Sequence, residues 1–221
     1  MRFVTFFLLC ILMESEAAAA TKPHVVSFGK TTTVKWYVGS EETKAIDLKI
    51  RALYVDARLK EFTLGLPHEV TDRLFVIQRA FRLNDALPQD KNPSPKWRWQ
   101  RGGWLLVDRV TGRVSILSLP EFDSYYSSAT WYRDYVAYCG VSDDGKKLFL
   151  IVAQLSRRKP VLKKADGEAK ADEMPDSECS PPVWERPARV TFAPRSDKFT
   201  YSVRGHAVDL VNDADEGENA E

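Results

Sequence analysis

Phe192-Ala-Pro-Arg-Ser-Asp-Lys-Phe-Thr-Tyr-Ser-Val203 has an apolar strand end, a polar turn and then a second apolar strand. The stretch from Tyr138 to Val152 has the same shape, and the stretch from Phe28 to Val38 is a fainter copy. Recurring strand–turn–strand units are typical of β-repeat arrays, in which one supersecondary piece is stacked several times. We therefore predict an all-β chain of antiparallel hairpin repeats.

Strand patterns also dominate the rest of the chain. Polar–apolar alternation or aromatic and β-branched clusters occur at residues 34–38, 48–54, 74–83, 104–107, 114–117, 135–138, 148–152, 190–192 and 199–203. Period-two alternation predicts strands, and no window after the first twenty residues keeps a helical stripe. Gly112 and Gly145 stand where tight hairpins need a left-handed residue, so we expect hairpins at residues 108–113 and 142–146.

A longer sequence repeat includes several of these predicted strands. Leu53-Tyr-Val-Asp56, followed by Leu64-Gly-Leu-Pro67, lines up with Leu106-Val-Asp108, followed by Leu117-Ser-Leu-Pro120. A unit of roughly 50 residues with about four strands has the size of a propeller blade. The alternative is that amphipathic strands ending in proline resemble each other by chance.

Two of the hairpins resemble a known family. The turn from Ser142 to Phe149 and the stretch from Phe192 to Tyr201 resemble the F-S-P-D-G-K hairpin of TolB-like and WD-repeat β-propeller blades. This resemblance implies a propeller-like fold, either a small propeller or a partial one. A fragmentary propeller that completes its ring with another chain is a further alternative.

The first twenty residues have the three-part pattern of a secretory signal peptide. Arg2 precedes a mostly apolar stretch from Phe3 to Met13, and an alanine run ends at Ala20. As a helix, the apolar stretch covers only about 16 Å of a hydrocarbon layer roughly 30 Å thick, so it is too short to span a membrane. We predict cleavage after Ala19 or Ala20 and an exported protein, periplasmic or extracellular, without a transmembrane span.

The remaining chain is predicted to form one β-repeat domain, residues 21–211. Within it, Lys163 to Pro182 has no large aromatic or β-branched residue and is expected to be a disordered loop. Gln89 to Lys96 is expected to be a further flexible stretch, and residues 212–221 an acidic, disordered tail. The chain has 32 basic and 31 acidic residues, so its charge predicts no nucleic-acid partner.

One segment combines carboxylates, aromatic rings and an arginine more densely than any other. Its candidate ligand-binding residues are Glu121, Asp123, Tyr125, Tyr126, Trp131, Tyr132, Arg133 and Asp134. Aromatic faces pack on sugar rings while carboxylates and arginine bind hydroxyls, and paired carboxylates are also what glycosidases use. The alternative is structural: the rings fill the gap between neighbouring repeats, and the charges are solvated or paired.

No motif predicts a catalytic residue, a cofactor or a metal. The histidines, His24, His68 and His206, are too scattered to define a zinc site. Cys139 and Cys179 are the cysteines left after signal removal, and an oxidising compartment allows a disulfide between them. The alternative is that Cys139 is simply a small buried residue of a strand.

We expect an exported, non-catalytic binding or scaffold protein whose partner is an unknown protein or a glycan. The alternative is a carbohydrate-binding or glycoside-cleaving protein that uses the segment from Glu121 to Asp134.

Overall fold

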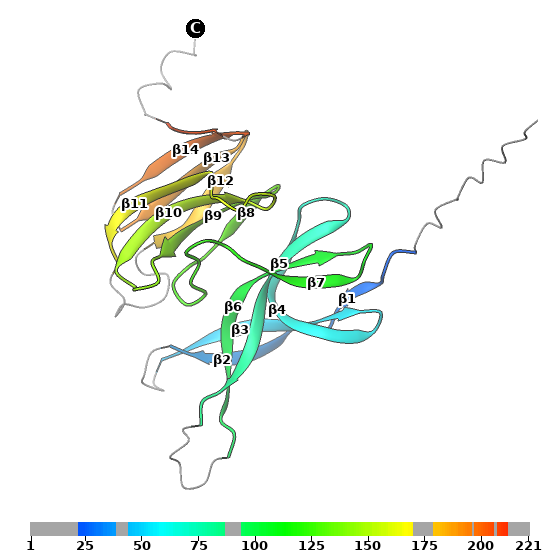
Figure 1. Cartoon of the computed structure of the whole chain (residues 1–221). Coiled ribbons are helices and arrows are strands. Elements are labelled where there is room, and N and C mark those ends of the chain that lie inside the picture. Colours follow the sequence, from blue (N-terminus) through cyan, green and yellow to red (C-terminus); the bar gives the residue numbers. More distant parts are fainter. Residues whose placement is uncertain are drawn as a thin grey trace, which may run out of the picture.

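The chain consists of β-strands and turns throughout the part that the structure describes. The computed structural model describes residues 22–38, 44–86, 94–169, 179–195, 197–205 and 207–211, and none of these residues is helical. The strands form one sheet of seven and two sheets of four, all pairs are antiparallel, and none of the sheets closes into a barrel within these ranges (Figure 1). The predicted all-β, antiparallel class is confirmed. The predicted signal peptide and acidic tail lie outside the described residues.

The seven-stranded sheet contains the first half of the chain. Its strands are β1 (Val26–Phe28), β2 (Thr32–Tyr37), β3 (Ala45–Val55), β4 (Arg58–Glu69), β5 (Leu74–Asn84), β6 (Trp97–Asp108) and β7 (Arg113–Leu117). They are ordered β1–β3–β4–β5–β6–β7, and β2 also pairs with β3. The first copy of the Leu-x-Leu-Pro pattern, residues 64–67, lies within β4, whereas the second copy begins at Leu117, the last residue of β7.

The stretch from Phe28 to Val38 is not a hairpin, although its pattern predicted one. β1 and β2 both pair with β3, so that Phe28 lies opposite Leu53 and Thr32 lies opposite Ile50. The two strands follow each other along one edge because β3 is long enough to pair with both. Leu53, on the part of β3 that pairs with β1, and Ile50, on the part that pairs with β2, are both buried.

The seven-stranded sheet buries side chains on both faces because it is strongly curled (Figure 1). The curl brings β2 close to β6, where the indole N–H of Trp36 donates to Oε1 of Gln100 at 3.0 Å. One core is made by Leu53, Phe75, Ile77, Leu105 and Val107. The other is made by Trp36, Val38, Leu48, Ile50 and Ala80.

Two four-stranded meanders follow. The first contains β8 (Thr130–Tyr132), β9 (Tyr135–Val141), β10 (Lys147–Gln154) and β11 (Leu162–Glu168), and the second contains β12 (Cys179–Glu185), β13 (Arg189–Pro194), β14 (Phe199–Arg204) and β15 (Ala207–Leu210). Figure 1 shows them side by side. We call β8–β11 the second sheet and β12–β15 the third sheet. A shared core joins them, with Leu150 and Val152 from the second sheet and Val190 and Phe192 from the third.

Both predicted tight hairpins are confirmed. β6 and β7 pair across a turn in which Gly112 has a φ of 64°, and β9 and β10 pair across a turn in which Gly145 has a φ of 71°. The stretch from Phe192 to Val203 also has the predicted shape, because Phe192 of β13 pairs with Phe199 of β14.

The segment from Lys163 to Pro182 differs from the expected loop at both ends. Its first residues belong to β11, which pairs with β10, and Cys179 to Pro182 begin β12. Lys163 and Lys164 give this polar strand contacts with aromatic rings, because their amino groups lie over the rings of Phe149 and Phe199, 4.3 and 4.1 Å from the ring centroids. Residues 170–178 lie outside the described part, as do residues 89–93 of the other predicted flexible stretch.

Candidate functional site

The predicted site segment connects β7 to β9 and crosses from the seven-stranded sheet to the second sheet. Its backbone is held in place by Arg101 of β6, whose guanidinium donates to the carbonyl oxygens of Ser124 at 2.9 Å and Ser127 at 3.0 Å. Asp123 closes the turn inside the segment, because its Oδ1 accepts the N–H of Tyr125 at 2.7 Å. These bonds fix the positions from which the predicted side chains extend.

A glycine lets this segment approach strand β9. The carbonyl of Glu121 accepts the N–H of Val141 at 2.9 Å, and Glu121 has a φ of 54°. A Cβ atom added at Gly140 would lie 2.8 Å from that same carbonyl oxygen and 2.7 Å from Cδ1 of Ile151. A larger residue at position 140 would therefore push the segment away from the sheet.

Each of the predicted carboxylates has a separate partner. Oε1 of Glu121 lies 2.6 Å from Nζ of Lys163 in β11. Oδ2 of Asp134 accepts the side-chain amide of Gln154 at 2.8 Å. Asp123 accepts the N–H of Tyr125 in the turn described above.

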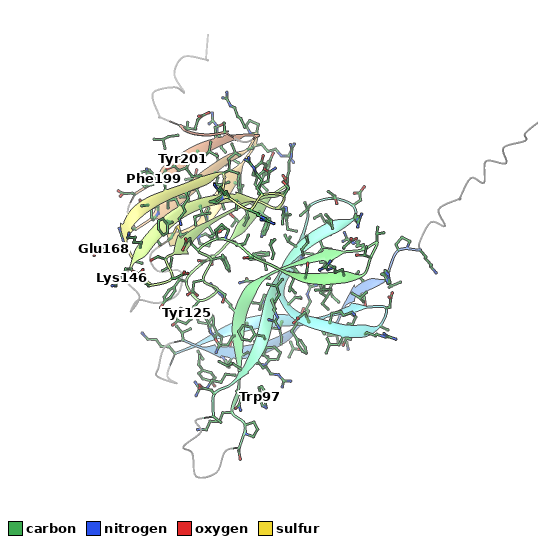
Figure 2. The ribbon with its side chains drawn as sticks, in the orientation of Figure 1. Trp97, Tyr125, Lys146, Glu168, Phe199 and Tyr201 are labelled. Carbon is green, nitrogen blue, oxygen red and sulfur yellow. A yellow bond between two sulfur atoms is a disulfide. The ribbon has the colours of Figure 1, made fainter. Side chains whose placement is uncertain are left out.

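The predicted aromatic residues pack against two different sheets. Tyr125, which Figure 2 labels, meets Trp36 of the seven-stranded sheet edge-on, with ring centroids 5.6 Å apart. Trp131 contacts Trp104 of the same sheet at 5.2 Å. Tyr132 instead stacks on Trp184 of the third sheet at 5.4 Å, with the planes 20° apart. These rings fill the junctions between sheets.

Arg133 belongs to the same junction. It has a φ of 55°, and its carbonyl oxygen lies 2.8 Å from Nε2 of His68 on β4. Its guanidinium lies over the ring of Tyr132, 5.5 Å from the centroid. The structure therefore separates Trp131, Tyr132, Arg133 and Asp134 from the residues near Tyr126.

Two hollows flank Tyr126, which lines both. The acidic hollow has a volume of about 490 Å³ and includes Glu121, Asp123 and Asp143 among its lining residues. The tyrosine hollow has a volume of about 340 Å³ and is lined by Tyr37, Asp85, Arg98, Gln100, Tyr125 and Tyr126. The structure thus gathers Glu121, Asp123, Tyr125 and Tyr126 around two neighbouring cavities.

The tyrosine hollow contains a charged pair and oriented polar groups. Oδ2 of Asp85 lies 2.9 Å from Nε of Arg98, and the Arg98 guanidinium lies over the ring of Tyr37, 5.4 Å from its centroid. Gln100 is held by the indole of Trp36. A ligand with hydroxyl groups and an apolar face would meet aromatic surface and hydrogen-bonding groups together.

Sequence reasoning missed Tyr37, Asp85, Arg98 and Gln100 as parts of a site. Arg98 and Gln100 belong to β6 and Asp85 follows β5, which pairs with β6, whereas Tyr37 comes from β2, which reaches β6 only through the curl of the sheet. Arg98 carried a weak signal because it stands between Trp97 and Trp99, but that pattern indicates strand packing as well.

Cys139 and Cys179 form a disulfide that joins β9 of the second sheet to β12 of the third. Their Cα atoms are 6.2 Å apart, and both side chains are buried in the core between the two sheets. The bond therefore fastens two sheets to each other.

The described residues contain no cluster of three or more histidine, cysteine or acidic side chains that could hold a metal ion. They also contain no helix of the length and apolarity that a membrane crossing requires. No protein-family model matches the chain, and neither a curated protein nor a solved structure matches it significantly.

Proposed function

We propose that this chain is an exported, non-catalytic binding or scaffold protein, and that it recognises its partner through the two hollows around Tyr126. The observation that carries this proposal is the tyrosine hollow. It presents three tyrosines beside an arginine, an aspartate and a glutamine. The predicted carboxylates support a non-catalytic role because each already has a structural partner.

A propeller-like arrangement of the two meanders is part of the proposal. Each is a four-stranded unit of consecutive strands, as a propeller blade is. Their first strands are neighbours, because the Thr130 hydroxyl of β8 donates to the Pro182 carbonyl of β12 at 2.7 Å and the Trp184 indole donates to the Thr130 carbonyl at 3.1 Å. Analytical ultracentrifugation tests ring completion by another copy, which requires a stable oligomer.

The binding proposal is tested with a glycan array and with immobilised candidate proteins. Replacing Tyr37 and Tyr126 by serine should abolish binding, because it removes two of the three rings of the hollow. The matched control is Trp97→Ala, since Trp97 is 57% exposed and points to the face of β6 opposite to that of its neighbour Arg98. Equal loss of binding in both variants would contradict recognition at the hollow.

A second candidate function is glycan binding or glycoside cleavage, favoured by the position of Glu121 and Asp123 in the acidic hollow next to Tyr126. A screen with chromogenic glycosides separates cleavage from binding. Hydrolysis that disappears in Glu121→Gln, while glycan binding persists, would replace the non-catalytic proposal with this one.

Export is tested separately by mass spectrometry of protein recovered outside the cytoplasm. We expect the first nineteen or twenty residues to be missing. An intact Met1 on the exported product would contradict the signal-peptide prediction.

A further inference from the structure

A third hollow lies at the other end of the seven-stranded sheet, and its lining is basic. It has a volume of about 400 Å³ and shares no lining residue with the two hollows around Tyr126. His24 precedes β1, Arg58 and Lys60 begin β4, and Thr111 and Gly112 belong to the β6–β7 turn. Three segments distant in sequence therefore meet around this hollow.

The β3–β4 hairpin places Arg58 at the edge of the hollow. Asp56 and Ala57 form a two-residue turn in which both residues have positive φ, 50° and 61°. This backbone twist matches that of the flanking strands and gives a tight hairpin, so Val55 pairs directly with Arg58. The position of Arg58 is therefore set by the turn that also contributes Asp56 to the lining.

A β-bulge places Lys60 in the same lining. Leu59 lies opposite Tyr54, and Glu61 lies opposite Leu53, so Lys60 is the extra residue between two successive pairs. A bulge bends its strand and redirects a side chain relative to a regular ladder. Lys60 consequently lines the hollow together with Arg58, its neighbour two positions earlier.

His24 forms a fixed wall of the hollow. Its Nδ1 lies 2.5 Å from Oδ2 of Asp56, and its backbone N–H donates to the Arg109 carbonyl at 2.9 Å. The ring also rests on the β6–β7 turn, because a Cβ atom at Gly112 would lie only 2.8 Å from its Cγ. Since Asp56 engages Nδ1, Nε2 is the ring nitrogen that can meet a ligand.

Positive charge exceeds negative charge in this lining. Asp56 is the one carboxylate among the residues that line the hollow, and its oxygens already accept bonds from His24 and from the Val25 N–H at 3.0 Å. Arg58 acts on Asp56 electrostatically, but neither Arg58 nor Lys60 forms a salt bridge with any described residue. Two cationic side chains thus have no carboxylate of the described residues in a salt bridge with them.

We propose that this hollow binds a tetrahedral oxyanion, a phosphate or sulfate group, either free or as an ester on a larger molecule. Guanidinium and ammonium groups make short, charge-assisted hydrogen bonds to such oxygens. The Thr111 hydroxyl adds a neutral donor, and His24 adds a third cation, after Arg58 and Lys60, when its ring is protonated. This site goes beyond the proposed binding function and shares no residue with it.

The test is isothermal titration of the full mature protein with inorganic phosphate, inorganic sulfate and a heparin-derived tetrasaccharide. The first two probes represent the free ion, and the third represents the ester. The double variant Arg58→Ala/Lys60→Ala should weaken binding by at least about tenfold, because charge-assisted bonds are the main attraction. Its matched control is Lys49→Ala/Arg204→Ala, which removes the same charge from two exposed residues outside the hollow.

Binding that the pocket variant loses and the control keeps would support the site, and the probe that binds identifies the source of the oxyanion. Equal weakening in both variants would overturn the proposal, because general electrostatic attraction would then explain the binding. Failure of all three probes to bind the unmodified protein at low salt would overturn it as well. Thermal melting of each variant checks that the fold is retained.

Discussion

Trp131 shows at the scale of one residue how a candidate ligand-binding ring can be structural instead. It lies between the seven-stranded and second sheets, in contact with Trp104 and stacked on His68 with ring centroids 6.0 Å apart. Its indole N–H is buried and has no acceptor among the described residues. These contacts indicate that Trp131 holds two sheets together.

We therefore expect Trp131→Ala to lower the free energy of unfolding by about 3 kcal/mol, as for other large aromatic truncations in packed regions. Denaturant titration followed by fluorescence measures the change. Trp97→Ala is the matched control and should cost only about 0.5 kcal/mol, since Trp97 is largely exposed and contacts Arg82 from the surface. If the Trp131 variant were as stable as the control, the structural interpretation would be wrong.

Asp108 provides a pH-dependent contribution to stability. Hydrogen bonds from the Arg73 guanidinium, followed by those from the N–H groups of Val110 and Thr111, hold the pKa of its carboxyl well below the usual range. A carboxyl whose pKa is lowered by folding stabilises the protein above its unfolded pKa, and this stabilisation is lost as the pH falls towards the folded value.

Asp108→Asn should accordingly be less stable than the unmodified protein at neutral pH. The difference should shrink as the pH falls below about 4, where the carboxyl of the unfolded chain becomes protonated. Thermal or urea unfolding at several pH values measures it. A difference that stays constant with pH would show that shape, and not charge, makes Asp108 important.

At the scale of elements, local patterns predicted the strands and hairpins, but long-range pairing decided what they became. Gly112 and Gly145 mark turns whose strands are adjacent in sequence, so these hairpins could be predicted. β11 could not, because its polar residues are ordered by the rings of Phe149 and Phe199 from other strands. The candidate site was likewise predictable from local sequence only in part. The density of aromatic and charged residues from Glu121 to Asp134 indicated Tyr125 and Tyr126, whereas Tyr37 joins them only through the curl of the sheet.

The β6–β7 turn gives a test at this scale. Gly112→Ala should destabilise the protein more than Gly65→Ala, although both glycines have similar positive φ values, 64° and 67°. Backbone strain of about 1 kcal/mol is common to both variants. At Gly112 the new methyl group also meets His24, whereas nothing lies within 4 Å at Gly65. Equal melting temperatures for the two variants would show that His24 does not pack on the turn as described.

At the scale of the whole molecule, the disulfide between Cys139 and Cys179 joins the second sheet covalently to the third. Cys139 and Cys179 are 40 positions apart, and the chain-entropy model gives about 4 kcal/mol for a closed loop of this length. Replacing both with alanine should lower the free energy of unfolding by roughly that amount. Chemical denaturation measures it, with the unmodified oxidised protein as reference. A change close to zero would mean that the core between the sheets suffices.

The same link determines what a protease can release. β10, β11 and their connections lie between the two cysteines along the chain, so a cut between Gly140 and Glu178 leaves both fragments attached through sulfur. A cleaved molecule would keep its full mass on a non-reducing gel and separate into two bands only after reduction. In a compartment rich in proteases, an exported protein with this disulfide would thus retain its C-terminal sheet after such a cut. A chain without the disulfide could lose that sheet.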